Sequence, residues 1–415
     1  PETLEVFLTL VFYYPRPRVQ ALDKVFKKSF WSVTAVIVTF DKEKFMPRST
    51  RPAGRCHGNR AFGSALLAAG VLFLASASFV RADSCPEPAV RIEATAATPL
   101  TELNYATAET QSLFAGAYVK KIAKETCSGG MGVLMHERVP SDPNHKDFAR
   151  VNYDTLYSWA LLDLTSPATI TLPETDGRYQ SAHVLNEGHW MPFVISEPGS
   201  FELTQENVGT RYALVGFRTQ MNMQDPEDIK QANALQDQIK LDQAEKGELV
   251  FKDLWDREAI MAQRKAYQKI RDEKGYKSED MFGKQGEISQ EMNNIGVAIG
   301  WGGQPKEGAV YLFYTPDSDA HQTLTLTEVP HAENSFWSIT VYDADGFVAS
   351  EPFNMNSSFA KTNANGDTVL NFGGDASAEN YLPVYPGWNA TLRIYTPQQA
   401  YFNGSWVRPE LQLKN

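Results

Sequence analysis

The sequence predicts a mainly β protein with helical segments, an α+β fold in which a helical connector joins two antiparallel β-sandwich units. Three observations lead to this fold class. Segments of alternating polar and apolar residues recur in both halves of the chain, as in Thr323–Thr327. Turn residues separate the C-terminal segments without a helical pattern between them, which is typical of a sandwich or jelly roll. A long charged stretch with a helical period lies between the two halves.

The N-terminal unit is expected over residues 83–220, as a helix followed by a β-sandwich. Thr98-Pro99 predicts the start of the helix, because proline is tolerated in a first turn, and Gly129-Gly130 predicts its end. From about Leu156 the apolar period changes to two, which indicates strands. Asp176-Gly177 is typical of a hairpin turn between two of these strands.

The helical connector is expected over residues 221–299. It begins with Asp225–Asp228, where an N-cap aspartate, a proline and two acidic residues indicate the start of a helix. The helical period continues to about Lys274, and Gly247 divides this stretch into two expected helices. Such a charged segment is typical of a solvated connector that buries one apolar stripe.

The C-terminal unit, over residues 300–415, is expected to be a jelly-roll-like β-sandwich. It follows the glycine-rich turn Gly300–Gly303, and Asn365-Gly366 is its strongest hairpin signal. The sequence pattern predicts strands at Ala309–Tyr314, Thr323–Thr327, Phe336–Tyr342, Thr368–Phe372 and Thr391–Tyr395.

The first part of the chain is expected to be absent from the working protein. Residues 1–45 contain no methionine, and we interpret them as translated upstream sequence before a natural start at Met46. Residues 46–82 combine a basic region, an apolar run and small residues before a cleavage point after Ala82, the layout of a secretory signal peptide. A membrane anchor is the alternative. The expected route is general secretion to the periplasm or the extracellular space, with no stable transmembrane segment after cleavage.

Charge and cysteine content restrict the partners and the compartment. The chain has 39 Lys and Arg against 50 Asp and Glu, a net charge of −11, which argues against a nucleic-acid partner. Cys85 and Cys127 follow the expected cleavage point, and in an oxidising compartment they predict one disulfide. Two free thiols are the alternative. The expected partner is a small molecule or a glycan. The sequence does not decide whether the protein forms a homo-oligomer.

Common catalytic signatures are absent from the sequence. It contains no G-x-S-x-G, H-E-x-x-H, P-loop or G-x-G-x-x-G motif, so we expect no nucleotide or flavin cofactor. The candidate catalytic residues are isolated polar side chains: His183, His189, Asp154 and Arg178. Imidazole and carboxylate groups can act as base and orienter, and an arginine can hold an anion. Structural histidines and Asx turns are the competing interpretation.

Two further sets of residues are candidates for binding. His183, Glu187 and His189 lie close together in the sequence, and imidazole and carboxylate can both ligate a divalent metal. Their spacing matches no established metal signature. The candidates for ligand contact are polar and aromatic residues at strand ends or on expected strands: Asn152, Tyr157, Trp337, Tyr342, Arg393 and Tyr395.

The order of several motifs resembles a known pair of families. Asn152–Ser158, followed by Gly177–Tyr179, resembles domain of unknown function 1254. The segments that resemble its usual partner, domain of unknown function 1214, are Gly300–Gly303, Phe336–Ser338, Tyr342-Asp343, Leu382-Pro383, Leu392–Tyr395 and Gly404–Pro409. The resemblance implies two β-sandwich units, the second jelly-roll-like, and implies no particular reaction.

Three functions of different classes stay open from the sequence. The favoured one is an exported protein that binds a small polar molecule or glycan in a cleft between its two sandwiches, because ligand sites prefer domain interfaces. The second is an exported hydrolase or lyase, with or without a metal, that uses His183, His189 and Asp154. The third is a structural oligomer of the cell envelope. Whether the protein is an enzyme is undecided at this level, since a fold does not determine a function.

Overall fold

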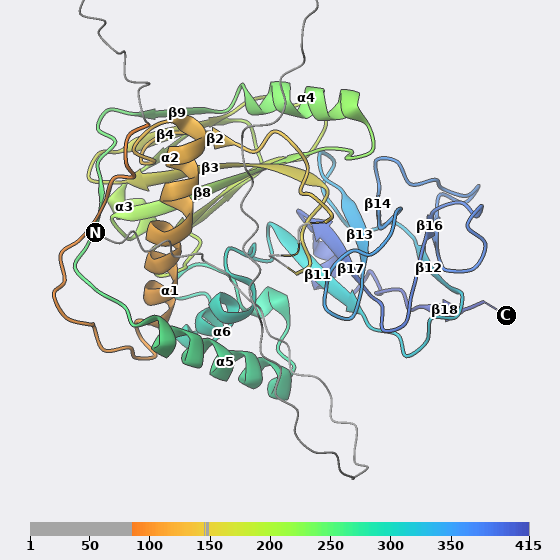
Figure 1. Ribbon diagram of the computed structural model, residues 1–415. Helices are drawn as coiled ribbons and strands as arrows, with labels where there is room; N and C mark the ends of the chain where they lie inside the picture. The colour runs from red at the N-terminus through yellow and green to blue at the C-terminus, as the bar shows by residue number, and fades with distance from the viewer. Residues whose placement is uncertain (1–84, 145, 147–148, 415) are drawn as a thin grey trace, which may run out of the picture. The chain divides into compact units, whose positions relative to one another are not determined.

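The computed structural model describes residues 85–144, 146 and 149–414 (Figure 1). Residues 1–45 and the expected signal peptide at 46–82 lie outside the described residues. The described part has an α+β fold with several antiparallel sheets, as the sequence predicts. Its helices include none that is both long and apolar enough to span a bilayer.

The described chain opens with a short strand and an interrupted helix. These elements are β1 (Val90–Ile92), α1 (Tyr105–Leu113), the π-helical turn η1 (Phe114–Tyr118) and α2 (Val119–Thr126). The helix begins at Tyr105 and not near Thr98-Pro99, because Asn104 closes a local turn instead. Its Nδ2 donates to the Pro99 carbonyl at 3.0 Å, and its Oδ1 accepts from the Thr101 amide at 2.7 Å. Cys127, in the left-handed region, follows the last residue of α2.

Two sheets follow in the N-terminal half. The five-stranded β8 sheet has the order β2-β3-β8-β5-β6, and the three-stranded β4 sheet has the order β7-β4-β9. The bounds are β2 (Met135–His136), β3 (Thr155–Asp163), β4 (Ala168–Leu172), β5 (Gln180–Asn186), β6 (Phe193–Ile195), β7 (Gly199–Leu203), the short helix α3 (Gln205–Val208), β8 (Tyr212–Gln220) and β9 (Lys240–Gln243). Asp176-Gly177 does not close a hairpin: it leads from β4 in one sheet to β5 in the other. A turn lets the chain reverse, but it does not decide which strands pair.

The stretch 221–299 holds more elements than the two expected helices. They are α4 (Pro226–Gln236), β9, β10 (Leu249–Phe251), α5 (Arg257–Lys274), the 3-10 turn η2 (Ser278–Asp280) and α6 (Gln290–Gly300). The side chains of Asp225 and Asp256 cap α4 and α5, as acidic N-caps do. Gly247 has a φ of 68° and lies in the loop between β9 and β10, and β10 pairs in parallel with β1. The connector is therefore tied by strand pairing to the N-terminal half.

Two four-stranded sheets form the C-terminal half. The β17 sheet has the order β11-β17-β13-β14, and the β12 sheet has the order β16-β15-β12-β18. The bounds are β11 (Ala309–Tyr314), β12 (Gln322–Leu326), β13 (Trp337–Tyr342), β14 (Asn354–Asn356), β15 (Thr368–Phe372), β16 (Tyr381–Leu382), β17 (Asn389–Tyr395), α7 (Gln399–Phe402) and β18 (Gln412–Leu413). The predicted strands at Ala309–Tyr314 and Thr368–Phe372 are confirmed. Asn365-Gly366 leads from the β17 sheet to the β12 sheet, so the predicted hairpin is wrong.

Three apolar clusters hold these layers together. The first contains side chains of α1, α2, α5 and α6 together with Leu161, Leu185 and Leu214 from one face of the β8 sheet. Figure 1 shows α1 and α2 crossing that sheet, with α5 and α6 at the end of α1. The second contains side chains of the β8 and β4 sheets, including Val215 and Ile170. The third contains side chains of both C-terminal sheets. One face of the β17 sheet takes no part in the third cluster, and that face leads to the candidate site.

Candidate functional site

Strand alternation gives the β8 sheet two different faces. Val215 points into the apolar cluster shared with the β4 sheet, and Leu214 packs on the opposite face beneath the helices. Further along that opposite face the side chains become polar or aromatic. The pairing of β3, β8 and β5 sets two rows side by side: Trp159, Gly216 and His183, then Tyr157, Arg218 and Ser181.

Gly216 makes room for the first of these rows. A Cβ atom at this position would lie 2.7 Å from Cζ3 of Trp159 and 2.8 Å from Cε1 of His183. Both rings therefore cover the glycine, at distances that any other residue would prevent. A glycine inside a strand often marks such a close approach. Here it lets the imidazole of His183 reach Arg218 in the next row.

The β17 sheet also has an apolar and a polar face, and both are buried. Its apolar face includes Ile339 and Leu392, in the cluster shared with the β12 sheet. The opposite face carries polar and aromatic side chains that are all buried: Ser338, Thr340, Tyr342, Asn354, Asn356, Thr391, Arg393 and Tyr395. Buried polar groups need partners, so a second polar surface has to cover this face.

Hydrogen bonds join this polar face to the start of β3. Asp154 is fully buried and accepts from Nδ2 of Asn356 at 2.9 Å and from Nδ2 of Asn354 at 3.3 Å. The hydroxyl of Tyr342 donates to the carbonyl of Val151 at 2.8 Å. We call the region where the two polar faces meet the polar junction, made up of Asp154, Tyr157, His183, Arg218, Tyr342, Asn354, Asn356, Arg393 and Tyr395.

Arg393 is a cation of the polar junction whose charge is balanced. Its guanidinium donates to the hydroxyl of Tyr342 at 2.7 Å, to Oγ1 of Thr340 at 3.1 Å and to a backbone carbonyl at 3.0 Å. Burial raises the pKa of Asp154, whereas the hydrogen bond from Asn356 and the positive charge of Arg393 oppose that rise. The asparagine hydrogen bonds and the charge of Arg393 thus favour the ionised form of Asp154, against the effect of its burial.

Arg218 is a second cation, and the described residues do not balance it. Only 7% of this residue is exposed. In the described part of the chain it forms no ion pair, its one hydrogen bond runs from Nη1 to Nδ1 of His183 at 3.0 Å, and it lies 5.5 Å from the centre of the Tyr157 ring. Because arginine can only donate, Nδ1 of His183 accepts and Nε2 carries the proton. Burial and then the charge of Arg218 lower the pKa of His183 well below its ordinary value, so this imidazole is neutral.

Tyrosine side chains surround Arg218. Those within electrostatic reach of its guanidinium are Tyr118, Tyr157, Tyr179, Tyr311 and Tyr395. Burial raises the pKa of Tyr118 and of Tyr395, so both hydroxyls keep their protons at neutral pH. Among the described residues, neither of these two hydroxyls has a hydrogen-bond partner. The surroundings of Arg218 therefore offer neutral hydroxyl groups and no counter-charge.

Half-buried aromatic rings continue from Arg218 towards η1. Tyr157 stacks on Trp159, with ring centres 5.4 Å apart and ring planes 2° apart. Tyr118, at the end of η1, lies 5.1 Å from the Trp159 ring and 5.3 Å from the Trp301 ring. Hydrogen bonds from both indole nitrogens, at 3.0 Å and 3.1 Å, hold the two tryptophans in place. We call Tyr118, Tyr157, Trp159 and Trp301 the aromatic wall.

Two family models match parts of the chain that meet at the polar junction. Residues 131–187 match a protein family of unknown function, DUF1254, and residues 313–399 match another, DUF1214. The chain therefore contains one region that matches DUF1254 and one region that matches DUF1214. The resemblance predicted from the motifs is thus confirmed. Asp154 and His183 lie in the DUF1254 match and Arg393 lies in the DUF1214 match, whereas Arg218 lies between the two.

Two solved structures from other organisms are similar to this chain. The VPA0106 protein from Vibrio parahaemolyticus is 16% identical, with a TM-score of 0.56 over 76% of this chain and 98% of that chain. An uncharacterized protein from Burkholderia cenocepacia is 12% identical, with a TM-score of 0.42 over 75% of this chain and 87% of that chain. At these identities the first similarity supports the fold alone. The search of curated proteins found no match.

The polar junction brings together several of the residues singled out from the sequence: Asp154, Tyr157, His183, Tyr342, Arg393 and Tyr395. Asn152 lies beside them. Its Nδ2 donates to the hydroxyl of Tyr157 at 3.2 Å, and its Oδ1 accepts from the backbone amide of Asp154 at 2.9 Å. The second contact is an Asx turn, the competing interpretation of this segment. Asn152 therefore sets the entry into β3 and also orients a ring of the junction.

Two other candidates lie outside the polar junction. Trp337 is only 5% exposed and belongs to the apolar cluster shared with the β12 sheet, because it alternates along β13 with the polar Ser338. Arg178 pairs through Nη2 with Asp176 at 2.8 Å and with Asp228 at 3.0 Å. Since two carboxylates already balance its charge, Arg178 is not the anion-holding group that the sequence suggested.

Where the structure describes the chain, the candidate metal ligands are not grouped. His183 contacts Arg218, whereas Nε2 of His189 accepts from a backbone amide at 2.9 Å. Glu187 accepts from Nε2 of Gln111 at 3.0 Å. In the described ranges, no three His, Cys, Asp or Glu side chains gather in a way that could hold a metal ion. The strand β5 ends before Glu187, so the residues that follow it leave the strand alternation that the sequence pattern assumed.

Several residues of the site were not predicted from the sequence, among them Tyr118, Gly216 and Arg218. Gly216 carried a signal, since an isolated glycine inside a strand often indicates a close approach. Arg218 follows an apolar run on β8 and resembles an ordinary solvent-facing residue at a strand end. Tyr118 lies in a helix whose π-helical turn has no sequence signature, although such turns are frequent at functional sites.

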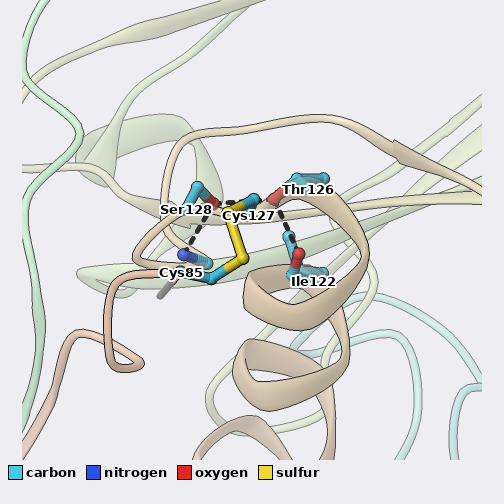
Figure 2. Close-up of a disulfide and its surroundings, with 6 residues drawn as sticks. Cys85, Ile122, Thr126, Cys127 and Ser128 are labelled. Atoms are coloured by element: carbon cyan, nitrogen blue, oxygen red, sulfur yellow. Dashed lines mark hydrogen bonds between the residues drawn. A yellow bond between two sulfur atoms is a disulfide. The ribbon is translucent and has the colours of Figure 1, made fainter. Parts of the chain in front are cut away.

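Cys85 and Cys127 form the predicted disulfide (Figure 2). It ties the chain before β1 to the residue that follows α2. There, Oγ1 of Thr126 donates to the carbonyl of Ile122 at 2.6 Å and lies 2.7 Å from Oγ of Ser128. The disulfide therefore anchors the far end of the helical segment whose π-helical turn carries Tyr118.

Proposed function

We propose that this protein binds a small organic anion at the polar junction, and that Arg218 recognises its negative charge. The observation that carries the proposal is the burial of Arg218 without a carboxylate partner among the described residues. Burying a charge without an opposite charge costs several kcal/mol. A bound anion would offset this cost and accept from the remaining N–H groups of the guanidinium.

The contact between Arg218 and His183 favours binding over the hydrolase or lyase alternative. A general base needs a nitrogen lone pair that is directed at its substrate. In this site Nδ1 of His183 already accepts from Arg218, and Nε2 carries the proton. The carboxylate of Asp154 is likewise engaged by two asparagine amides. We therefore assign His183 the role of orienting Arg218.

A two-sandwich architecture around the site is part of the proposal. The β8 and β4 sheets share one apolar cluster, and the β17 and β12 sheets share another, which supports two sandwiches. The strand content of the C-terminal pair supports a jelly-roll-like unit. We place the protein in the periplasm or outside the cell, since the disulfide is favoured in an oxidising compartment.

The test uses the purified protein and a panel of small carboxylates, measured by thermal shift and by titration calorimetry. At least one carboxylate is expected to raise the Tm of the wild type, because a ligand of the native state shifts unfolding by mass action. Arg218→Gln is expected to weaken this binding about 10- to 100-fold, the usual effect of losing a charged hydrogen bond. Arg408→Gln is the matched control. Like Arg218, Arg408 lies close to a tyrosine ring, 4.3 Å from that of Tyr314, but unlike Arg218 it is exposed.

Two results would contradict the proposal. One is unchanged carboxylate affinity in a folded Arg218→Gln variant. The other is the absence of binding across the panel together with concentration-dependent self-assembly, which would support the structural oligomer instead.

A further inference from the structure

The groups around Arg218 also indicate what kind of anion the site accepts. We infer that the polar junction binds a sugar acid of the hexuronate type, a sugar ring that carries one carboxylate and several hydroxyl groups. This inference rests on the proposed function. Three features carry it: a single unbalanced positive charge, neutral hydroxyl groups next to that charge, and the half-buried faces of the aromatic wall.

The charge of the polar junction fits one carboxylate. Arg393 interacts electrostatically with the carboxyl group of Asp154, and His183 is neutral, so Arg218 leaves one positive charge that has no acidic partner among the described residues. A planar guanidinium can donate two parallel hydrogen bonds to a carboxylate. A phosphate ester would bring close to two negative charges at neutral pH, and one of them would remain unbalanced.

The tyrosine hydroxyls fit a ligand that has hydroxyl groups of its own. Tyr118 and Tyr395 interact electrostatically with the cations of the junction, and in the described part of the chain their hydroxyls have no hydrogen-bond partner. A phenolic hydroxyl can both donate and accept. A sugar hydroxyl satisfies both capacities, whereas a hydrocarbon acid would leave these polar groups without partners, at a cost in affinity.

The aromatic wall provides a surface for the apolar face of a sugar ring. Tyr157 lies between Arg218 and Trp159, and it is only half-buried. The indole nitrogen of Trp159 is held by a carboxylate oxygen of Glu137 at 3.0 Å, so this ring is fixed before a ligand arrives. A carboxylate on Arg218 would therefore place the attached ring near fixed aromatic surface, which favours a ring-shaped ligand over an open-chain acid.

The test separates the contributions of the carboxylate and of the hydroxyl groups. Titration calorimetry compares glucuronate and its epimer galacturonate with three probes that each change one feature. Glucose lacks the carboxylate, benzoate lacks the hydroxyl groups, and glucose 6-phosphate replaces the carboxylate with a dianion. At least one hexuronate is expected to bind 10-fold or more tightly than all three probes.

Tyrosine-to-phenylalanine variants test the hydroxyl contacts without removing a ring. Tyr118→Phe and Tyr395→Phe are each expected to weaken hexuronate binding about 3- to 10-fold, the usual effect of losing a neutral hydrogen bond. Neither variant is expected to weaken benzoate binding, because benzoate has no hydroxyl group to pair with these tyrosines. Tyr276→Phe, just after the end of α5, is the matched control and is expected to change neither. Circular dichroism of each variant checks that the fold is intact.

The outcomes distinguish this inference from the proposed function. If benzoate binds as tightly as both hexuronates, and Arg218→Gln abolishes benzoate binding, the sugar-acid inference is overturned. The proposed anion site at Arg218 is then still supported. Tighter binding of glucose 6-phosphate would do the same. Glucose that binds as tightly as a hexuronate would overturn both, because the carboxylate would then contribute nothing. Failure of both hexuronates to bind would overturn the inference.

Discussion

Replacing each buried arginine of the polar junction with methionine should have opposite effects on the ligand-free protein. Arg393→Met removes a guanidinium that has three hydrogen bonds and leaves Asp154 buried without an opposite charge. Losing these hydrogen bonds and this opposite charge inside the protein costs about 3–5 kcal/mol. Arg218→Met removes a buried charge that has no carboxylate partner, so it also removes the cost of burying that charge.

The balance for Arg218→Met can be worked from its contacts. The variant loses one hydrogen bond to a neutral histidine, about 1 kcal/mol, and one cation–π contact with Tyr157, about 1–2 kcal/mol. The variant also no longer has to bury a charged guanidinium, which removes a desolvation cost of several kcal/mol. The free energy of unfolding should therefore be unchanged or higher by up to about 2 kcal/mol, while the same variant no longer binds anions.

The assay is urea unfolding of both variants and the wild type, followed by fluorescence and circular dichroism without added ligand. The expected difference between the two variants is about 3 kcal/mol or more. A loss of about 3 kcal/mol or more in Arg218→Met would refute the reasoning, since it would mean that the protein itself compensates this guanidinium. Lysine at either position keeps the charge and serves as the matched control.

The remaining predictions concern the rows around Arg218, the disulfide and a buried histidine. Gly216→Ala should cost about 1–3 kcal/mol in urea unfolding, and should weaken anion binding about 10-fold or more because its Cβ meets the ring of Trp159 at 2.7 Å; unchanged binding would contradict this. Removing both Cys85 and Cys127 should lower the free energy of unfolding by about 4 kcal/mol, from the loop-closure estimate for a separation of 42 residues, and reductant should then no longer change the urea midpoint. Burial lowers the pKa of His189 to about 4, so its stabilising contribution is complete above its unfolded pKa and is lost as the pH falls towards 4. The drop in unfolding free energy from pH 7 to pH 5 should therefore be about 2 kcal/mol smaller in His189→Gln than in the wild type, and equal drops would argue against this assignment.

Strand positions could be predicted from the sequence because alternation is a local property. The pattern that predicted β11 and β15 depends on residues next to one another in the chain. Pairing partners depend on residues far apart, and this is why Asp176-Gly177 and Asn365-Gly366 were wrongly expected to close hairpins. Both turns connect two sheets, which a local pattern cannot distinguish from a hairpin.

Part of the candidate site could be predicted for a similar reason, and part could not. Asp154, His183 and Arg393 were identified because they are polar residues in otherwise β-rich segments. Alternation shows that a strand has a polar face, but it does not show whether that face meets water or another polar face. Arg218 was therefore indistinguishable from a solvent-facing residue, although it is one of the most buried charges in the described structure.

The polar junction also explains why the two halves of this chain fit together. Within the described residues, the carboxyl group of Asp154, in the DUF1254 match, accepts hydrogen bonds only from groups of the DUF1214 match, and Arg393 of that match favours its charged form. Separating the halves would expose polar groups at little cost in water, whereas a mismatched pairing would bury them without partners at several kcal/mol. The junction therefore selects the correct pairing more than it adds stability. Arg218 is the exception, because the described residues of the C-terminal half supply no carboxylate for it. This exception is the reason to place a ligand there.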